Sequence, residues 1–351
     1  MVGRHMMQAV VYREFQGSMA VESVDRPVVA PHGVLIEVRA NGVCRSDWHA
    51  WMGHDPTVAL PHVPGHEMAG VISEAGDEVT LWTAGDRVVV PFSCGCGTCG
   101  PCTSGYGNIC DNEYQPGFSG WGSMAELAAV PRADFNVVRL PDTVEFTAAA
   151  ALGCRFMTAY QGLVERARVQ PGEWVAVHGA GGVGLSVVQI AKAMGANVVA
   201  VDLDDAKLEL ATALGADAVV NGTRDKPVNV IRSVTGGGAD ISIDALGAAV
   251  TAQNSIRCLA KRGRHVQIGL VLDEGVNLPI PMSRVIALEL EILGSHGMPA
   301  RRYPEIFELI GSGKVDPGAL VGKTIALTDA PAELAAMGAF AQIGTTVIEF
   351  S

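Results

Sequence analysis

The chain reads Gly179-Ala180-Gly181-Gly182-Val183-Gly184 directly after the apolar run Trp174–His178. The stretch has the pattern G-x-G-x-x-G, whose glycines permit a tight turn and a close approach of a ligand to the backbone. An amphipathic run, Val183–Met194, follows it, and Asp202 ends the next apolar run. A strand, a glycine-rich turn, a helix and an acidic residue in this order are typical of a dinucleotide-binding βαβ unit.

The residues of this motif predict how a dinucleotide would be held. The N–H groups and the dipole of a helix N-terminus favour the pyrophosphate. Asp202 is expected to accept hydrogen bonds from the adenosine ribose, and its charge repels a 2′-phosphate, so the motif favours NAD over NADP. A glycine-rich turn used only for packing is disfavoured, because strand, helix and acidic residue are all present. The expected cofactor contacts are Gly179, Gly181, Gly182, Val183, Gly184, Asp202 and, through the ribose, Lys207.

Strand-length and helix-length segments alternate from Trp174 onward. The predicted strands are Trp174–His178, Asn197–Val201, Ala218–Val220, Asp240–Asp244, Arg264–Ile268 and Glu291–Gly294. The predicted helices are Val183–Met194, Asp205–Leu214 and Val250–Leu259. Gly195 and Gly215 stand where helix C-termini favour glycine. The alternation predicts an α/β fold of the Rossmann class, a doubly wound parallel sheet with helices on both faces.

The first part of the chain has a different pattern. Short Val- and Ile-rich runs broken by Gly, Pro and Asp, such as Val34–Val38 and Asp86–Pro91, predict a compact β-rich domain from residue 7 to about residue 150. The 351 residues are too many for one simple core and suit two domains. Hydrophobic residues make up 48% and aromatic residues 5%, which favours an α/β protein with buried parallel strands.

Charge and run length argue against some partners. The net charge of −12 disfavours non-specific binding to nucleic acid or to an anionic membrane. No apolar run approaches the roughly 20 residues that span a bilayer. Eight cysteines without a recognisable secretory signal predict a cytoplasmic protein whose thiols are reduced and serve as metal ligands.

Four of the cysteines lie in one short loop with the spacing C-x2-C-x2-C-x7-C: Cys96, Cys99, Cys102 and Cys110. Zn²⁺ prefers four such ligands at tetrahedral corners, and the glycines of the loop let the backbone turn the thiolates inward. A four-thiolate site is closed and therefore structural. Disulfides would need an oxidising compartment, and spacing alone leaves an iron–sulfur cluster open. Cys94, beside the set, is interpreted as a loop or pocket-wall thiol that could compete for the ion, and Cys258 as a core residue.

Three further segments carry side chains that bind metals. They supply a thiol, an imidazole and a second thiol, from Cys44, His66 and Cys154. Three protein ligands leave the fourth position of a zinc ion open, as a catalytic site requires. Each residue alone is more often an ordinary buried side chain, so the argument rests on the three together.

The chain thus carries the three metal-binding contexts in order, together with the four-cysteine loop and the G-x-G-x-x-G unit. Over essentially its whole length it resembles the zinc-dependent alcohol dehydrogenases of the medium-chain dehydrogenase/reductase superfamily. The resemblance implies a GroES-like catalytic domain at residues 1–153 and 297–351, with a structural zinc lobe at about 94–112. It implies a Rossmann NAD-binding domain at residues 154–296, and a final strand, residues 345–350, that returns to the first domain. Two zinc ions per chain are expected.

The resemblance also implies roles at the catalytic zinc. Cys44, His66 and Cys154 would bind the ion. Glu67 would be the carboxylate that approaches the metal during ligand exchange, and Asp47 would hydrogen-bond His66 and fix its ring. Zinc lowers the pKa of a hydroxyl bound to it, which favours transfer of hydride to the nicotinamide.

Other residues match the family's proton relay and pyrophosphate contact. Ser46 and His49 match the relay, and Arg45 matches the pyrophosphate contact. The family often carries a further arginine just before the final strand, where this chain reads Ile343-Gly344-Thr345-Thr346. Cofactor binding is therefore expected to rest more on Arg45 and on the helix N-terminus.

The implied activity is reversible hydride transfer between NAD and a primary or secondary alcohol, aliphatic or aromatic, giving an aldehyde or ketone. A largely apolar cleft suits such substrates, and the family places these residues near it: Ser46, Trp48, Trp51, Phe92, Trp121 and Leu270. Ordinary packing is an equal alternative for each of them. Cys154 argues against sugars, because polyol dehydrogenases of the superfamily usually carry a carboxylate as the third ligand.

Two other functions remain open on the sequence. A zinc-independent enone or quinone reductase of the same superfamily would lack the catalytic ligands. A non-catalytic NAD-binding protein would not need the relay residues Ser46 and His49. Family members are dimers or tetramers, and a chain of this length favours a homotetramer.

Overall fold

The computed structural model describes residues 6–271, 278 and 280–350. The chain divides into two compact units. The first comprises Met1–Met157, Gly297–Gly311 and Leu320–Ser351, and the second Thr158–His296 and Ser312–Ala319. The chain passes from the first to the second within helix α5 (Met157–Tyr160), slightly later than the boundary expected at residues 153 and 154. Residues 312–319 group with the second unit rather than the first.

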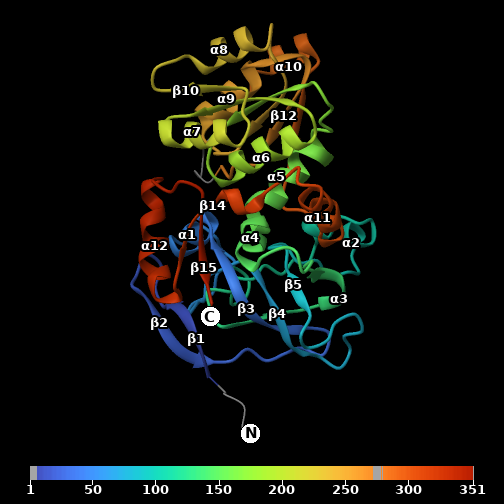
Figure 1. Ribbon diagram of the computed structural model, residues 1–351, viewed down its shortest axis with the longest axis vertical. Coiled ribbons are helices and arrows are strands. Elements are labelled where there is room, and N and C mark those ends of the chain that lie inside the picture. Colours follow the sequence, from blue (N-terminus) through green and yellow to red (C-terminus); the bar gives the residue numbers. More distant parts are fainter. Residues whose placement is uncertain (1–5, 272–277, 279, 351) are drawn as a thin grey trace. The chain divides into compact units, whose positions relative to one another are not determined.

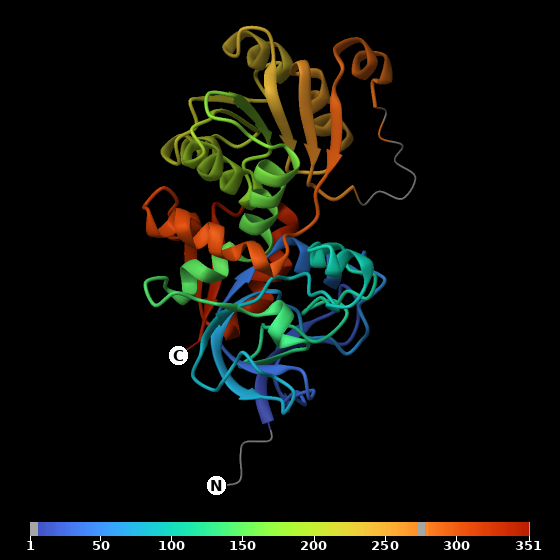
Figure 2. The ribbon, with the colours of Figure 1, turned by 90° about the vertical axis from the view of Figure 1, so that its right-hand side faces the viewer.

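The second unit is built on a six-stranded parallel sheet with the order β10-β9-β8-β11-β12-β13. Its strands are β8 (Trp174–His178), β9 (Asn197–Asp202), β10 (Ala218–Asn221), β11 (Ala239–Asp244), β12 (Leu259–Gln267) and β13 (Glu291–Gly294). The sequence winds outward in both directions from β8 and β11, which is the order of a doubly wound Rossmann sheet. The predicted fold class is therefore confirmed. Figure 2 shows the strands side by side with helices packed along them.

The helices of the second unit connect these strands. They are α6 (Gly182–Ala193), α7 (Asp205–Ala213), α8 (Pro227–Val234), α9 (Ala249–Arg257) and α10 (Met282–Leu288), with a π-helical segment at Gln161–Arg166. The sequence did not predict α8 and α10, and it extended the third helix to Leu259, where β12 already begins. Gly195 and Gly215 follow α6 and α7 with φ of 80° and 106°, the left-handed cap expected of them.

The first unit contains a seven-stranded sheet and a separate antiparallel pair (Figure 1). The sheet has the order β14-β15-β3-β4-β5-β7, with β6 paired to β3. Its strands are β3 (Val34–Val43), β4 (Glu67–Ala75), β5 (Arg87–Val89), β6 (Leu127–Val130), β7 (Val138–Arg139), β14 (Val321–Ile325) and β15 (Thr345–Glu349), and the pair is β1 (Met6–Tyr12) and β2 (Met19–Asp25). Because β15 pairs with β3, the end of the chain belongs to the first unit.

Short helices complete the first unit. They are α1 (Arg45–Trp51), α2 (Gly100–Thr103), α3 (Ala133–Asn136), α4 (Phe146–Ala151), α11 (Tyr303–Gly311) and α12 (Ala330–Ala336). Alternate residues of β3, Val34, Ile36 and Val38, point into one buried cluster with residues of β4 and β5, as the two-residue period of a strand requires. Within the described part of the chain, no helix is long and apolar enough to cross a membrane.

The pairing of β3 with β4 positions the candidate site. The two strands are antiparallel, and Gly42 near the end of β3 lies opposite Glu67 at the start of β4. The residues that follow β3 and those that precede β4 are therefore brought together, although they are distant in sequence.

Candidate metal centres and cofactor site

The three sequence contexts for a catalytic metal meet in the first unit. Cys44 follows β3, His66 precedes β4, and Cys154 lies in a π-helical turn, Leu152–Phe156, that follows α4. The ligand atoms of Cys44, His66, Cys154 and Glu67 all lie within 4.8 Å of one another. The sequence predicted these four residues as one site, and the structure brings them together.

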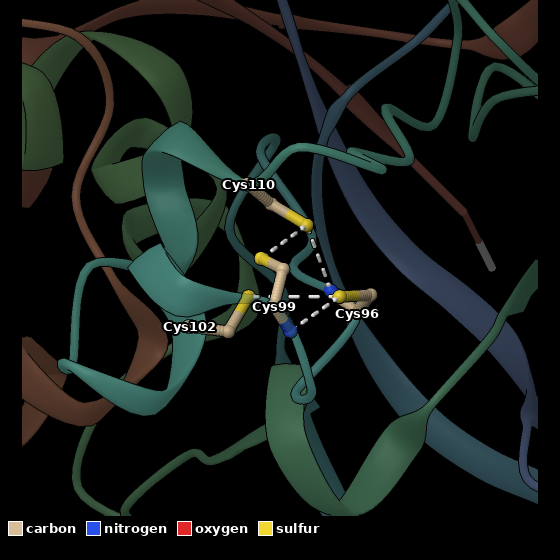
Figure 3. Close-up of side chains that lie close together, drawn as sticks. All are labelled: Cys96, Cys99, Cys102 and Cys110. Carbon is tan, nitrogen blue, oxygen red and sulfur yellow. Dashed lines mark hydrogen bonds between the residues drawn. The ribbon is translucent and has the colours of Figure 1, made fainter.

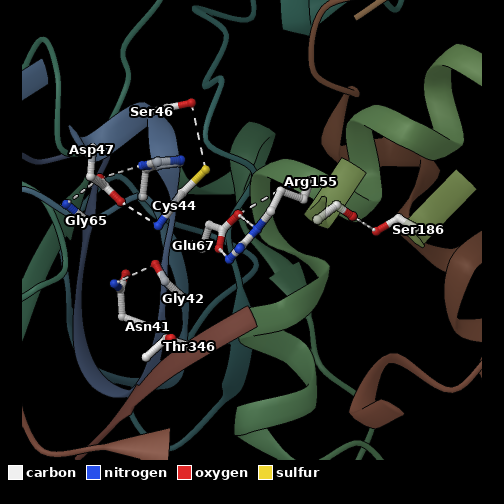
Figure 4. Close-up of polar contacts among 12 residues, drawn as sticks. Asn41, Gly42, Cys44, Ser46, Asp47, Gly65, Glu67, Arg155, Ser186 and Thr346 are labelled. Atoms are coloured by element: carbon white, nitrogen blue, oxygen red, sulfur yellow. Dashed lines mark hydrogen bonds and ion pairs between the residues drawn. The ribbon is translucent and has the colours of Figure 1, made fainter. Parts of the chain in front are cut away.

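Asp47 orients the histidine of this cluster, and Figure 4 shows its carboxylate beside the backbone of Gly65 and Cys44. Its Oδ1 accepts a hydrogen bond from His66 Nδ1 at 2.7 Å and another from the backbone N–H of Gly65 at 3.0 Å. Its Oδ2 accepts from the backbone N–H of Cys44 at 3.1 Å. The buried carboxylate of Asp47 thus fixes the ring of His66 and the backbone at Cys44 and Gly65. This geometry is the one that its predicted role requires.

The remaining ring nitrogen of His66 fits a metal. His66 Nε2 is buried and makes no hydrogen bond to any residue that the structure describes. A buried polar atom without a partner is costly, so this one calls for a ligand. Since Nδ1 is bonded to Asp47, Nε2 is the atom left for a zinc ion, and two thiols beside it complete a three-ligand set.

The two thiols differ in their affinity for a proton. A hydrogen bond from Cys154 lowers the pKa of Cys44 well below its ordinary value, against the effect of burial. The same hydrogen bond, with burial, raises the pKa of Cys154. Burial acts to lower the pKa of His66, but the Asp47 carboxylate outweighs it and raises that pKa. The pair therefore favours the thiolate, the form that binds metals, at Cys44 rather than at Cys154.

Glu67 is held by an arginine that the sequence analysis did not single out. Arg155 donates from Nε to Glu67 Oε1 at 3.0 Å, and its Nη2 forms an ion pair with Oε2. Burial raises the pKa of Glu67 to about 7, although the Arg155 charge opposes the rise. No local sequence signal indicates this pair, because its members lie 88 positions apart.

The four-cysteine loop folds into a compact cluster of sulfurs (Figure 3). Cys96 Sγ lies 4.0 Å from Cys102 Sγ, and Cys99 Sγ lies 3.7 Å from Cys110 Sγ. Four sulfurs at about 2.3 Å from one ion would be about 3.8 Å apart, so these distances fit a tetrahedral zinc site. All eight cysteines are free thiols, which argues against the disulfide alternative.

Backbone N–H groups support the sulfurs of this cluster. The N–H groups of Thr98 and Cys99 donate to Cys96 Sγ at 3.4 and 3.3 Å, and that of Cys96 donates to Cys110 Sγ at 3.1 Å. Hydrogen bonds from Thr98, first from its hydroxyl and then from its backbone N–H, lower the pKa of Cys96 to about 5. The loop therefore stabilises negative sulfur at Cys96, whereas burial raises the pKa of Cys102 to about 12 and also raises that of Cys110.

The glycine-rich motif lies between β8 and α6 in the second unit. Gly179 has φ of 97°, and a Cβ on Gly184 would lie 1.8 Å from the carbonyl oxygen of Gly179, so both positions require glycine. A Cβ on Gly181 would meet nothing within 4 Å, which leaves space above the start of α6. Asp202 Oδ2 accepts from the backbone N–H of Ala180 at 2.7 Å, so this carboxylate also fixes the turn. Lys207 lies half-buried in α7.

Comparisons with known proteins agree with this geometry. The family models described as "Alcohol dehydrogenase GroES-like domain" and "Zinc-binding dehydrogenase" match residues 30–142 and 182–312. An alcohol dehydrogenase of Geobacillus stearothermophilus is 38% identical over 88% of this chain and 90% of its own. The chain belongs to the zinc-type alcohol dehydrogenases of the medium-chain dehydrogenase/reductase superfamily.

Other relatives of this dehydrogenase extend the likeness over nearly the whole chain. An NAD-dependent alcohol dehydrogenase of Sulfurisphaera tokodaii is 36% identical over 92% of this chain and 95% of its own. The solved structure of an alcohol dehydrogenase from Thermus sp. ATN1 superposes with a TM-score of 0.89 at 30% identity, covering 98% of this chain and 99% of that one.

The two residues predicted to form a proton relay, Ser46 and His49, lie on α1. Ser46 Oγ lies 3.8 Å from Cys44 Sγ. His49 Nδ1 lies 3.0 Å from Nδ1 of the exposed His54, a neighbour that the sequence analysis missed. Burial, helped by the charge of Arg45 and by His54, lowers the pKa of His49 to about 4. His49 is therefore neutral near pH 7 and able to accept a proton.

Arg45 is held by the C-terminal part of the first unit. Its Nη1 donates to the carbonyl oxygen of Met337 at 2.7 Å, and its Cζ lies 3.4 Å from the ring centroid of Phe340 and 4.7 Å from that of Trp48. These contacts fix the guanidinium within the first unit. Its contact with the pyrophosphate remains a prediction.

The aromatic residues expected near the substrate divide into two groups. Phe92 lies against the ring of His66, at 6.0 Å between centroids, and Phe118, which was not predicted, lies closer at 5.1 Å. Trp51 and Trp121 instead donate from Nε1 to the carbonyl oxygens of Gly17 and Pro61, which is the packing alternative. Leu270 is exposed in the second unit.

The two remaining cysteines are ordinary core thiols. Cys94 is buried, lies 3.4 Å from the carbonyl oxygen of Pro91 and is not part of the four-sulfur cluster. Cys258 is buried in the core of the second unit, as predicted.

Proposed function

We propose that this dehydrogenase catalyses reversible hydride transfer between NAD and a primary or secondary alcohol, aliphatic or aromatic, with zinc held by Cys44, His66 and Cys154. The observation that carries the proposal is the partnerless, buried Nε2 of His66 beside two thiols, one of them favoured as the thiolate. Zinc bound there would act as a Lewis acid toward the oxygen of the alcohol or carbonyl compound.

The protein's own groups position the reactants and carry the proton. Asp47 accepts a hydrogen bond from His66 Nδ1, so the neutral ring, the form that binds a metal, would present Nε2. The hydroxyl of Ser46, 3.8 Å from Cys44 Sγ, would receive the proton of the alcohol. His49 is neutral near pH 7 and would be the next proton acceptor once the cofactor is bound.

The second unit binds the cofactor in this proposal. The pyrophosphate would lie over the N-terminus of α6, beside Gly181, and Asp202 would accept from the adenosine ribose. The same carboxylate would repel a 2′-phosphate, so NAD is favoured over NADP. Lys207 and Arg45 would add contacts with the ribose and the pyrophosphate.

A second zinc ion, bound by the four-cysteine loop, would be structural. The sulfur distances and the N–H groups directed at Cys96 and Cys110 support it. The chain would thus carry two zinc ions. We also propose a cytoplasmic homotetramer, by analogy with the family; light scattering of the purified protein tests the subunit number.

A substrate panel tests the activity. Purified protein is assayed for NADH or NADPH formation with short, branched and aromatic alcohols, and in reverse with the matching aldehydes and ketones. We expect turnover with NAD that is lost in Cys44→Ala. Retained turnover of enones or quinones by Cys44→Ala would support the zinc-independent reductase instead. No turnover on any alcohol or carbonyl compound would support the non-catalytic alternative.

A further inference from the structure

One guanidinium engages both oxygens of the carboxylate in the catalytic cluster. Arg155 Nε donates to Glu67 Oε1 at 3.0 Å, the backbone N–H of Arg155 lies 3.4 Å from the same oxygen, and Nη2 pairs with Oε2. The side chain of Glu67 is 0% exposed and that of Arg155 10%. Such bidentate pairs are the strongest and most directional ion pairs in proteins, so the orientation of the carboxylate is set by Arg155.

The surrounding backbone is shaped around this pair. A Cβ on Gly42 would lie 2.1 Å from Glu67 Oε2, and a Cβ on Gly153 would lie 2.5 Å from Glu67 Cβ. Gly153 also departs from helical geometry, with φ of −47° and ψ of −125°, within the π-helical turn. The turn therefore places two consecutive residues on the cluster: Cys154 as a ligand and Arg155 on Glu67.

Glu67 is close enough to matter to the metal. Its ligand atom lies within the same 4.8 Å set as those of Cys44, His66 and Cys154. Carboxylates bind zinc readily, and a fourth protein ligand would convert an open catalytic site into a closed one of the structural kind. Both oxygens, however, are occupied by Arg155 in this structure.

We propose that Arg155 is a positioning residue that keeps Glu67 from becoming a fourth zinc ligand and so keeps one coordination position open for the substrate. The inference rests on the proposed function only in taking Cys44, His66 and Cys154 as the metal ligands. It adds a residue that makes no contact with the metal but decides whether the site is open.

Removal of the arginine should close the site. In Arg155→Gln the buried carboxylate loses its partner, and a metal ion beside it becomes the nearest positive charge. Glu67 then takes the fourth position. In the double variant Arg155→Gln/Glu67→Gln no carboxylate remains, and the position should be open again.

Binding of imidazole to the cobalt-substituted protein tests this without any turnover. Co²⁺ in the catalytic cluster reports an added ligand by its visible absorption, whereas a four-thiolate site is closed and does not respond. We expect the affinity of Arg155→Gln for imidazole to be lower than that of the wild type by a factor of about ten or more. Residues that position a metal ligand without touching the metal have effects of this size. The double variant should recover most of the loss.

A matched variant separates closure of the metal site by Glu67 from a general loss of packing. Arg302 forms a similar two-point pair with Glu305 in the same unit but outside the cluster, so Arg302→Gln should leave imidazole binding unchanged. If Arg155→Gln binds imidazole with wild-type affinity, or if the double variant binds it as weakly as the single one, this inference is overturned while the proposed metal site stands. A wild-type protein that shows no imidazole-responsive cobalt would overturn the proposed metal site and this inference with it.

Discussion

Replacement of Asp47 by alanine should disturb both the fold and the metal site of the first unit. Asp47 accepts three hydrogen bonds in a fully buried position: from the ring of His66 and from the backbone N–H groups of Gly65 and Cys44. Alanine leaves two backbone donors buried without a partner. Each costs about 1–3 kcal/mol, so we expect a loss of about 2–6 kcal/mol in the free energy of unfolding.

The metal site should suffer separately from the stability. Without Asp47 the ring of His66 is free to rotate, and the affinity for zinc should fall by about 10–100-fold. Asp47→Asn should be intermediate, because its oxygen can still accept from His66 and Gly65 while its NH₂ group faces the N–H of Cys44, donor against donor.

Two assays check these expectations. Urea unfolding gives the free energy, and competition with a chromogenic chelator gives the zinc affinity. Asp142→Ala, a change at an exposed carboxylate of the same unit, serves as the control and should match the wild type in both. An Asp47→Ala protein that holds its zinc within twofold of the wild-type affinity would refute the role of Asp47 in orienting His66.

Four further predictions concern both units. Cys99→Ser should reduce the zinc content by one ion and lower the melting temperature, read by metal analysis and calorimetry; unchanged zinc content would contradict the four-thiolate site. Gly184→Ala should abolish NAD binding or folding, because its Cβ would lie 1.8 Å from the Gly179 carbonyl oxygen, and calorimetric titration with NAD decides. Asp202→Ala should weaken NAD binding and narrow the preference over NADP, read from the ratio of kcat/KM values; an unchanged ratio would count against its ribose role. Burial lowers the pKa of His178 from 6.5 to about 4, so the unfolded chain binds the proton more readily than the folded one. The free energy of unfolding should therefore fall by up to about 3 kcal/mol as the pH drops from 6.5 toward 4. Urea unfolding of His178→Gln should lack the share of this pH-dependent loss that comes from His178.

The sequence predicted the second unit well because its central strands, β8, β9 and β11, are almost entirely buried. Such strands read as continuous apolar runs, and one of them, Trp174–His178, has the predicted bounds. Glu291–Gly294 also has the predicted bounds, although it lies at the edge of the sheet and none of its residues is buried. The start of β12 was missed, since Lys261 and Arg262 are polar and Arg262 has a positive φ of 60°. Helix α8 was missed because its short sequence has a narrow apolar face, with Ile231 as its one fully buried residue.

The candidate site was predicted where its residues carry their own local patterns. Cys44, His66 and Cys154 each stand in a recognisable context, and the structure brings them together. Arg155 could not be found in this way, because an arginine in a sequence usually reads as a solvated charge. Its burial depends on β3, β4 and the π-helical turn all being in place, and no local pattern encodes that.

The separation of a structural and a catalytic zinc is tested most directly by counting the metal in Cys44→Ser. Metal analysis of the wild type should give two zinc ions per chain, and Cys44→Ser should give one, with the melting temperature nearly unchanged and NAD-linked alcohol oxidation lost. Cys94→Ala, a buried thiol of the same unit outside both clusters, should keep two ions and full activity. Two zinc ions or undiminished turnover in Cys44→Ser would contradict the assignment of the catalytic site.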